Sequence, residues 1–378
     1  MSSAAPAAPA PGSSNTTTPR RRRRARLGLV AGAVVLVLAV VATWAYVDFF
    51  KPATTCQQQA GIDVICGFNN PEDMAQVGDT PWVLASDLGD KNWQDGGMSA
   101  YNADTGSVVD VSIDFTTPMA AAYEGCPGPP DTTAFSAHGL SLQENDGATT
   151  LLVVNHGGRE SVEAFDVSLQ GAAPTLAWKG CAIYPDGKVG NSVAAYGDNE
   201  FLATVPQDSG LSKGAVYAWA PGDGWNRKDN LEFEGNNGIL VSPDNESVYI
   251  AEWSAGKVTK APLTGNAPVV ESDDLGFLPD NLRFASDGSI YATGQDTSVV
   301  VIAGVCNTTS VEVCPAASSV TQLDPTTLAA SPQLTLPRTK TFGGATSAIV
   351  VGDDMLVSSF RSDAILRIPT TELPLLRS

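Results

Sequence analysis

A unit of strand, turn and strand recurs along the chain, and it constrains the fold more than any other feature of the sequence. In each copy a polar residue opens an apolar strand, a turn with Asp or Asn follows six to eight positions later, and a second apolar strand comes after the turn. The copies open at His138, Asn191, Asn237, Asn281 and Thr346. These openers lie 53, 46, 44 and 65 residues apart, a spacing typical of a four-stranded propeller blade.

A sixth blade is expected from two further apolar segments, 81–85 and 97–101, that precede the first copy of the unit. Beyond the N-terminal region no long helical periodicity occurs, and short apolar runs alternate with Asp, Asn and Gly turns, as in all-β domains. The sequence therefore predicts an all-β, six-bladed β-propeller over residues 66–378. Its last strand, 364–368, is expected to pair with N-terminal material and close the ring.

The N-terminal region carries a different kind of sequence. Residues 27–47 form an apolar run of 21 residues without a charge, and at 1.5 Å per residue it reaches about 31 Å, enough to cross a bilayer. Six arginines precede this run, which favours a cytoplasmic N-terminus. We expect a disordered basic tail over 1–26, a transmembrane signal anchor over 27–47, a linker over 48–65 and an extracytoplasmic propeller. The alternative is a cleaved signal peptide and a secreted product.

The cysteines agree with export. All six follow the apolar run, and no two are spaced as a C-x-x-C pair, so an even number in an oxidising compartment indicates disulfides. Six cysteines allow many pairings, and short loops favour Cys56–Cys66, Cys126–Cys181 and Cys306–Cys314. Asn245 and Asn307 begin glycosylation sequons, which matter only if the host modifies exported chains.

The charge excludes one class of partner. The formal net charge is −19, although the arginine cluster lies near the N-terminus, so the rest of the chain is more acidic still. An acidic surface repels phosphate backbones, and a nucleic-acid partner is therefore not expected. Neither charge nor composition indicates an oligomeric state.

The strand openers predict a cation site. The first strand of each propeller blade lines the central channel, so the residues that open those strands gather at one mouth of it. Asn191, Asn237 and Asn281, with Asp280 beside the last, supply side-chain oxygens from successive blades, as a hard cation requires. The alternative is that these residues merely begin strands and turns, where Asn and Asp are common.

The two histidines are predicted to meet. His138 opens one strand, His156 closes the next, and the turn between them centres near Gly147, midway in number. An antiparallel hairpin with that turn places both rings side by side on the rim that holds the proposed cation. Four tryptophans, Trp82, Trp178, Trp219 and Trp253, are expected only to fill blade cores.

Several ordered segments resemble the paraoxonase/arylesterase family of calcium-dependent six-bladed lactonases. The segments are Pro71-Glu-Asp-Met, Ser136-Ala-His-Gly-Leu-Ser, Leu151-Leu-Val-Val-Asn-His, Asn236-Asn-Gly-Ile-Leu-Val-Ser-Pro-Asp, Val248-Tyr-Ile-Ala-Glu and Pro279-Asp-Asn-Leu. The likeness covers most of residues 66–368, and gluconolactonase and regucalcin are similar at a greater distance. It implies a catalytic calcium ion bound by Glu72, Asn191, Asn237, Asp280 and Asn281, with His138 and His156 as the catalytic pair.

The resemblance has two gaps. A second, structural calcium of the family would be bound here by Asp73 and the backbone carbonyl of Leu140, but Ser192 stands where the family has an aspartate, which would weaken the site. The family closes its ring with a cysteine near the C-terminus, and none follows Cys314. Closure is therefore expected to rest on strand pairing alone, or on a different cysteine pattern.

The resemblance implies hydrolysis of lactones and aryl esters. Calcium would polarise the carbonyl group, His138 would remove a proton from water, and His156 would orient His138. Two alternatives are a sugar-lactone hydrolase of the gluconolactonase type and a non-catalytic calcium-binding ectodomain. Turnover of a lactone panel separates these functions.

Overall fold

The computed structural model describes residues 32–43, 62–90, 92–145, 147–209, 213–307 and 312–373. These residues belong to two units, 1–51 and 52–378. In the first unit residues 32–43 are helical. Among the described residues, no helix is both long enough and apolar enough to cross a membrane. The ends of the predicted anchor, the basic tail before it and most of the linker lie outside the described residues.

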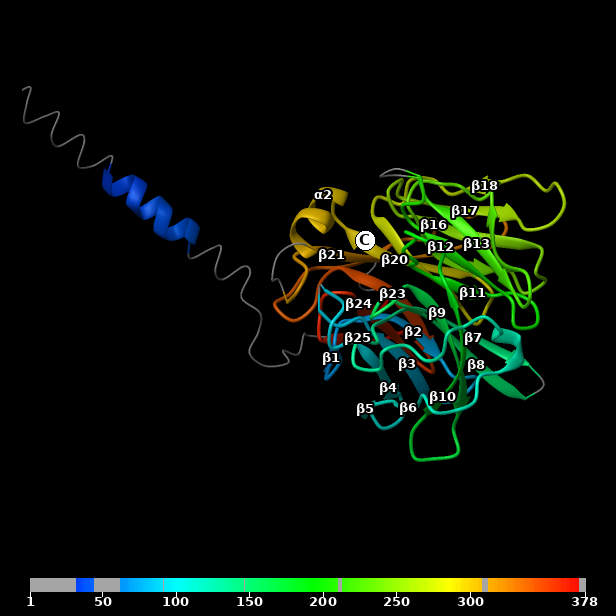
Figure 1. Cartoon of the computed structure of the whole chain (residues 1–378). Coiled ribbons are helices and arrows are strands. Elements are labelled where there is room, and N and C mark those ends of the chain that lie inside the picture. The colour runs from blue at the N-terminus through cyan, green and yellow to red at the C-terminus, as the bar shows by residue number, and fades with distance from the viewer. Residues whose placement is uncertain are drawn as a thin grey trace, which may run out of the picture. The chain divides into compact units, whose positions relative to one another are not determined.

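The second unit consists of six antiparallel sheets, one of which gains a parallel edge strand (Figure 1). The first blade contains β2 (Pro71–Gln76), β3 (Trp82–Asp87), β4 (Gly97–Asn102) and β5 (Val108–Asp110). The second blade contains β6 (Ser112–Asp114), β7 (Ala137–Asn145), β8 (Ala148–Asn155), β9 (Ser161–Ser168) and β10 (Thr175–Ile183). The third blade contains β11 (Val193–Ala195), β12 (Phe201–Val205), β13 (Ala215–Ala220) and β14 (Gly224–Lys228), and the fourth contains β15 (Asn236–Val241), β16 (Ser247–Glu252), β17 (Lys257–Pro262) and β18 (Val270–Glu271). The last two contain β19 (Leu278–Phe284), β20 (Ile290–Asp296), β21 (Ala317–Leu323) and β22 (Leu334–Leu336); and β23 (Ala345–Val351), β24 (Asp354–Ser359), β25 (Ala364–Pro369) and β1 (Asp63–Cys66). Three short helical segments are η1 (Ala121–Tyr123), α2 (Val299–Val301) and η2 (Ile302–Cys306).

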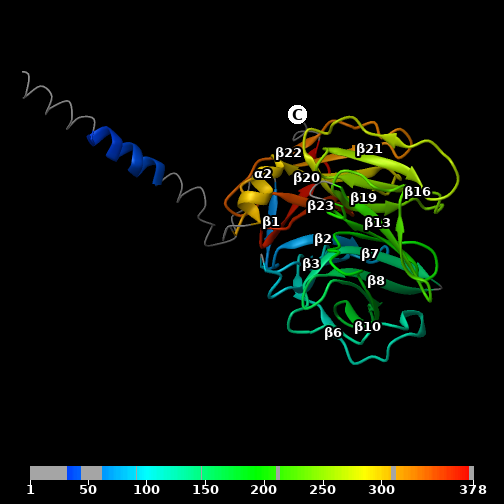
Figure 2. The same ribbon diagram turned by 45° about the horizontal axis from the view of Figure 1, so that its top comes forward.

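The sheets form a closed ring. The first strands of the blades contact one another in the order β2, β7, β11, β15, β19, β23 and back to β2, and Figure 2 shows the sheets grouped about a common centre. The prediction of an all-β, six-bladed propeller is confirmed. Many strands are buried along most of their length, as in β12 and β16, because each sheet packs against neighbours on both faces. Met74, Phe165 and Phe201 are among the fully buried residues.

Strand β1 closes the ring. It pairs with β25 in antiparallel register, with Cys66 opposite Ala364 and Asp63 opposite Arg367. The predicted pairing of the last strand with N-terminal material is therefore confirmed. Strand β1 begins at Asp63, so the propeller starts within the segment that was expected to be a linker. Pairing with β1 covers the edge of β25, so that the edge of this sheet is a short strand of four residues, which is a poorer template for aggregation.

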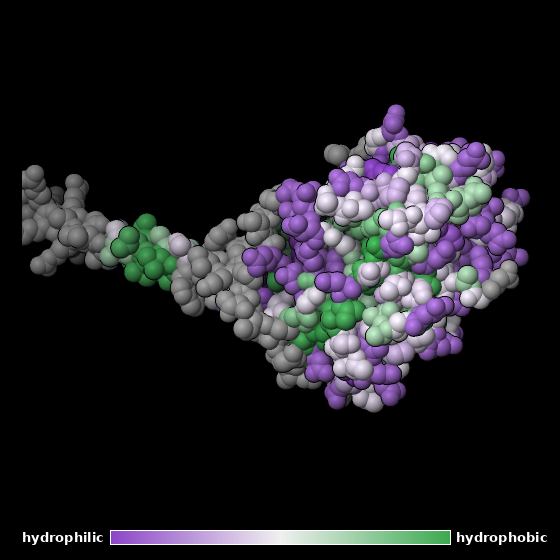
Figure 3. Space-filling view, turned by 60° about the horizontal axis from the view of Figure 1, so that its bottom comes forward, coloured by the Kyte–Doolittle hydropathy of each residue, from purple (hydrophilic) through white to green (hydrophobic). Residues whose placement is uncertain are grey.

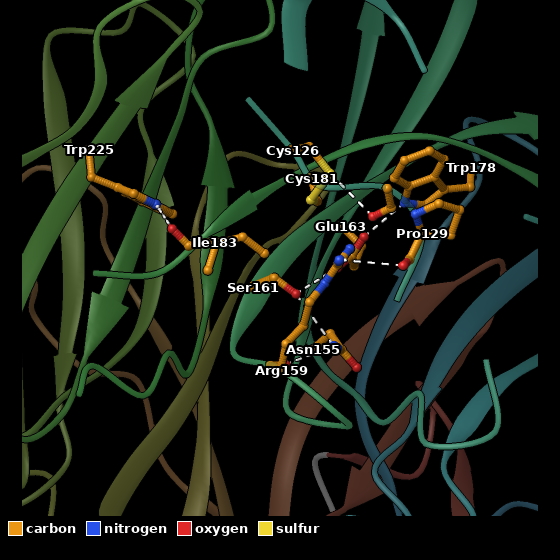
Figure 4. Close-up of a disulfide and its surroundings, with 11 residues drawn as sticks. Cys126, Pro129, Asn155, Arg159, Ser161, Glu163, Trp178, Cys181, Ile183 and Trp225 are labelled. Atoms are coloured by element: carbon orange, nitrogen blue, oxygen red, sulfur yellow. Dashed lines mark hydrogen bonds and ion pairs between the residues drawn. A yellow bond between two sulfur atoms is a disulfide. The ribbon is translucent and has the colours of Figure 1, made fainter. Parts of the chain in front are cut away.

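Two of the three predicted disulfides form, Cys126–Cys181 and Cys306–Cys314. In the third predicted pair, Cys56 lies outside the described residues. Figure 4 shows the first disulfide beside the buried carboxylate of Glu163, which accepts hydrogen bonds from Arg159 and from Trp178 Nε1. The surface in Figure 3 is mostly polar, with apolar side chains gathered in patches.

β-Bulges lie at the start of five inner strands. The pairing register shifts between Pro71 and Met74, Ala137 and Leu140, Asn236 and Ile239, Pro279 and Leu282, and Ala345 and Ser347. A bulge leaves a residue out of the ladder and re-aims side chains. In this fold the bulges contain Glu72, His138, Asn237, Asp280 and Asn281, and Thr346 lies in the fifth.

Candidate active site

The predicted site residues meet at one mouth of the central channel. A cavity of about 620 Å³ lies there. Its walls include Glu72 from β2, both histidines, Asn191 just before β11, Asn237 from β15 and Asp280 from β19. Asn281 is buried behind them, and its Nδ2 donates to Glu72 Oε1 over 2.9 Å.

Among the residues that the structure describes, three buried side-chain oxygens of this group have no hydrogen-bond partner. They are Glu72 Oε2, Asn237 Oδ1 and Asn281 Oδ1. A buried polar atom without a partner is costly, and three of them around one cavity fit a ligand that would bind them together. The donors are all hard oxygens from carboxylates and amides, which is the chemistry that Ca²⁺ prefers. Among the described residues no group of three or more His, Cys, Asp and Glu side chains is arranged to bind a metal; here amides make up most of the donor set.

Burial and neighbouring negative charge together raise the pKa values of the Glu72 and Asp280 carboxyl groups. Burial, followed by the neighbouring carboxylate of Asp73, raises the pKa of Glu72 well above its usual value. Burial and then the charge of Glu72 do the same to the pKa of Asp280. Gln295 Nε2 donates to Asp280 Oδ2 over 2.6 Å, which offsets only part of this effect. A divalent cation between the carboxyl groups would favour their ionised forms.

The two histidines lie side by side, as predicted. His138 is in β7 and His156 follows the end of β8, and the distance from His138 Nδ1 to His156 Nε2 is 2.6 Å. His156 Nδ1 lies 2.9 Å from Glu160 Oε2. His138 Nε2 faces Glu72 Oε2 at 3.5 Å. The side chains therefore form a continuous row from Glu160 through both rings to Glu72.

This row of hydrogen bonds determines which ring nitrogen of each histidine carries the proton. The Glu160 carboxylate is an acceptor, so His156 donates from Nδ1 and its Nε2 carries a lone pair. His138 then donates from Nδ1 to His156, which leaves a lone pair on His138 Nε2, the atom that faces Glu72 Oε2 at the cavity wall. Burial lowers the pKa of His138 to about 4 and also lowers that of His156. Both rings are therefore neutral at pH 7, and His138 Nε2 can accept a proton.

Asn155 holds the two histidine segments in place. Its Oδ1 accepts hydrogen bonds from the backbone N–H groups of Ser136 and Gly157, at 3.0 and 3.1 Å. Its Nδ2 donates to the carbonyl of Arg159 at 2.9 Å. One buried amide thus joins the backbone before His138 to the turn that carries His156 and Glu160, so the ring positions are fixed by the fold.

Several residues of the cavity, and one that lies behind it, were not predicted from the sequence. Trp93 stacks on His156 with ring centroids 4.5 Å apart, and Glu160 binds His156. Trp253, expected only in a blade core, lines the cavity and donates from Nε1 to Gln295. Arg361 also lines the cavity. An acid four residues after a histidine, or a lone Trp or Arg in a loop, carries no sequence signal of such a role.

The residues expected at a second calcium site also come together. Asp73 lies in β2, Leu140 in β7 and Ser192 just before β11. The Asp73 carboxylate and the Leu140 carbonyl both accept hydrogen bonds from the guanidinium of Arg283. The hydroxyl of Ser192 is buried and has no hydrogen-bond partner within the described ranges.

Comparison with known proteins gives one family match. The family model described as Arylesterase matches residues 91–364, which is well over half of the chain. No curated protein sequence matches. Among solved structures, a luciferin-regenerating enzyme is 10% identical with a TM-score of 0.50, and the match covers 81% of this chain and 94% of that one.

Two further structures are similar at lower scores. The periplasmic gluconolactonase of Pseudomonas aeruginosa is 17% identical, with 78% of this chain and 80% of that chain covered and a TM-score of 0.44. A virginiamycin B lyase from Staphylococcus aureus is 12% identical, with 81% and 98% covered and a TM-score of 0.44. At these identities the likeness is one of fold alone.

Proposed function

The chain belongs to the arylesterase family, and on that premise we propose that it is a calcium-dependent hydrolase of aryl esters and lactones. One observation carries the proposal. Buried oxygens without partners and a neutral histidine pair meet in a single cavity at the channel mouth. The first feature fits a hard cation, and the second fits general-base activation of water.

Calcium would be bound by Glu72, Asn191, Asn237, Asp280 and Asn281. When bound there, the ion supplies polarisation of the substrate carbonyl and stabilisation of the oxyanion. His138 Nε2 takes a proton from the attacking water and passes it to the leaving alkoxide or phenoxide. His156 accepts from His138 Nδ1 and donates to Glu160, so the pair keeps one tautomer through the reaction.

The test uses the chain from Pro52 onward, assayed with phenyl acetate and with a panel of aliphatic, acyl-homoserine and sugar lactones. We expect hydrolysis that is lost with a calcium chelator and restored by calcium, with bound calcium counted by elemental analysis. Activity that survives chelation would overturn the metal role. Selective turnover of sugar lactones would instead indicate a gluconolactonase type, and calcium binding without any turnover would indicate a non-catalytic ectodomain.

Two variants separate the roles within the site. Asn237→Leu removes one unpaired oxygen and is expected to weaken calcium binding by at least tenfold. Asn226→Leu, an exposed position on β14, is the matched control. His138→Gln should leave calcium binding in place and lower kcat by 10²-fold or more. Unchanged turnover in His138→Gln would exclude it as the base.

We also propose that residues 27–47 anchor the enzyme in a membrane, with the propeller outside the cytoplasm. The uncharged run after the arginine cluster and the disulfides of the propeller support this location. Fractionation of cells that express the full chain tests it. Recovery in the membrane fraction is expected, whereas release of a shortened chain would indicate a cleaved signal peptide.

A further inference from the structure

Arg283 binds inner strands next to the residues of the candidate active site. It follows Asn281 by two residues on β19. Its Nη2 donates to Asp73 Oδ2 and, over 3.1 Å, to the carbonyl of Leu140; its Nε donates over 2.9 Å to the carbonyl of Met74. One guanidinium thereby joins β19 to β2 and β7, three inner strands that are far apart in the sequence.

Asp73 and the Leu140 carbonyl are the two ligands that the family resemblance assigns to a second calcium ion. Both Asp73 oxygens are satisfied here, because Leu140 N also donates to Oδ2 and Met74 N donates to Oδ1. The oxygens of the candidate active site differ, since Glu72 Oε2, Asn237 Oδ1 and Asn281 Oδ1 have no partner among the described residues. With Ser192 in place of a carboxylate and a guanidinium already bound, the residues present do not fit a second divalent cation.

We propose that Arg283 takes the place of the structural calcium in this chain. A divalent ion between two carboxylates is replaced by a single positive charge beside a single carboxylate, so the charge of the group still balances. The guanidinium holds the inner strands together permanently, and its rigid fork suits a carboxylate and carbonyls at once. The enzyme would therefore bind at most one calcium ion, and its fold would depend little on calcium.

The experiment counts calcium per chain and measures Tm with and without chelator. The wild type is compared with Ser192→Asp alone and with the double variant Arg283→Ser/Ser192→Asp. We expect at most one ion in the wild type, one more in the double variant than in the wild type, and a larger rise of Tm with calcium in the double variant. Two ions in the wild type would overturn the proposal, even if the double variant fails to fold.

Arg283→Met supplies a second readout. It should lower Tm in chelator more than Arg367→Met, which removes a partly exposed arginine paired with Asp354. Equal losses would contradict a bridging role for Arg283. A wild type that binds no calcium would refute the proposed function but not this inference, because the gain of one ion in the double variant is measured relative to the wild type.

A second, independent observation concerns Arg361 in the active-site cavity. The residue is only 6% exposed. Its guanidinium donates to the carbonyls of Cys306, Gly89 and Phe360 at 3.3–3.4 Å. Within the described part of the chain it forms no ion pair with a carboxylate. The charge of Asp90 acts on Arg361 without an ion pair, and Glu72 and Asp280 of the same cavity form no ion pair with it among the described residues. A buried guanidinium without a directly bound counter-charge is costly.

We infer that the substrate carries a carboxylate that Arg361 binds. This inference rests on the proposed function, because the same cavity must admit the ester. The remaining wall is largely apolar, with Trp93, Trp253 and Phe360 among its residues, so an aryl or alkyl body that ends in a carboxylate matches its chemistry. Carboxylate and guanidinium would pair in a water-poor site, where such a contact is strong.

The test compares phenyl hydrogen succinate with phenyl propionate, which differ only in the carboxylate. We expect kcat/KM of the wild type to be at least tenfold higher for the succinate ester. In Arg361→Met the ratio of the two kcat/KM values should fall at least tenfold, with partial retention in Arg361→Lys. Taking the ratio removes general effects of the substitution on the fold.

Calorimetric binding of butyrate and butyramide gives a readout that needs no turnover. Butyrate should bind the wild type more tightly than butyramide, and this preference should vanish in Arg361→Met. Arg361-dependent butyrate binding without hydrolysis of either ester would refute the proposed function and leave the inference standing. Hydrolysis of phenyl propionate with no preference for the anionic ligands would refute the inference alone.

Discussion

Asparagine opens the inner strand of three successive blades, and the burial of its side chain decides its role. In the described part of the chain, Asn237 and Asn281 each keep a buried Oδ1 without a hydrogen-bond partner. The oxygen of a residue that merely starts a strand would instead bind backbone or water. Asn191 lines the same cavity. The sequence could predict these positions because all three occupy the same slot of a repeat.

Glu160 supplies a first prediction at the residue scale. Its carboxylate fixes the tautomer of His156, so Glu160→Gln should lower kcat by about 10- to 100-fold while KM and calcium affinity change little. The amide can still accept at its oxygen, so the fold should be retained. Initial rates with phenyl acetate, together with calcium titration, measure both. A higher KM with unchanged kcat would mean that Glu160 contacts the substrate instead.

Glu160, Trp93 and Arg361 show where prediction from the sequence ends. The histidine pair was predictable because a hairpin with a known turn fixes which residues face each other. The partners of that pair come from a turn and from loops, whose path depends on packing against other blades. No spacing rule connects Trp93 or Arg361 with His156, which lies some 60 and 200 positions away from them.

Asp87 supplies a prediction for stability. Burial raises its pKa from 3.8 to about 6, although Ser99 and the backbone of Asn69 donate hydrogen bonds to it. The folded chain then holds the proton more tightly than the unfolded chain, so stability is lost as the pH rises from about 4 to about 6. The loss is on the order of 3 kcal/mol.

The variant Asp87→Asn removes this titration. Relative to the wild type, its free energy of unfolding should increase with pH across that window and stay level above it. Denaturant unfolding at pH 4.5 and at pH 7.5 measures the difference between the two proteins. A difference that is the same at both values would contradict the raised pKa.

At the scale of elements, the bulged inner strands explain how consecutive residues reach one site. In a regular strand, Asp280 and Asn281 would point to opposite faces. The bulge between Pro279 and Leu282 removes that constraint. The sequence predicted the strands and their order but not the bulges, because bulge formation depends on how a neighbouring strand approaches.

Gly238 allows strands β15 and β19 to lie close together. A Cβ there would lie 2.3 Å from the carbonyl oxygen of Asp280 and 2.8 Å from Cα of Asn281. Gly238→Ala must therefore push β15 away from β19 and separate ligands on the two strands. We expect a loss of roughly 2–4 kcal/mol in stability and at least tenfold weaker calcium binding.

The matched control is Gly97→Ala, because a Cβ at Gly97 meets nothing within 4 Å. Thermal unfolding and calcium titration are run on both variants in parallel. If Gly238→Ala behaves like Gly97→Ala, the close contact between the strands does not determine the site geometry.

At the scale of the whole molecule, ring closure joins the two ends of the propeller without a cysteine near the C-terminus. The repeat spacing was enough to predict six blades, since each blade is one copy of a unit. The closing strand was predictable only as a partner for 364–368. Its location at Asp63–Cys66 could not be read from so short a segment, because four residues carry little periodicity.

Removal of β1 should therefore open the propeller. A chain that starts at Gly67 loses the ladder to β25 and the buried side chains of Ile62 and Val64, which are 3% and 4% exposed. Burial of each such side chain stabilises the fold by about 1.5–3 kcal/mol, so Tm should fall by roughly 10 °C or more. The edge of β25 becomes free, and self-association should increase. A chain that starts at Ile62 keeps β1 and is the control, compared by thermal unfolding and size-exclusion chromatography. Equal Tm values and equal elution would mean that the other blade contacts are sufficient to hold the ring closed.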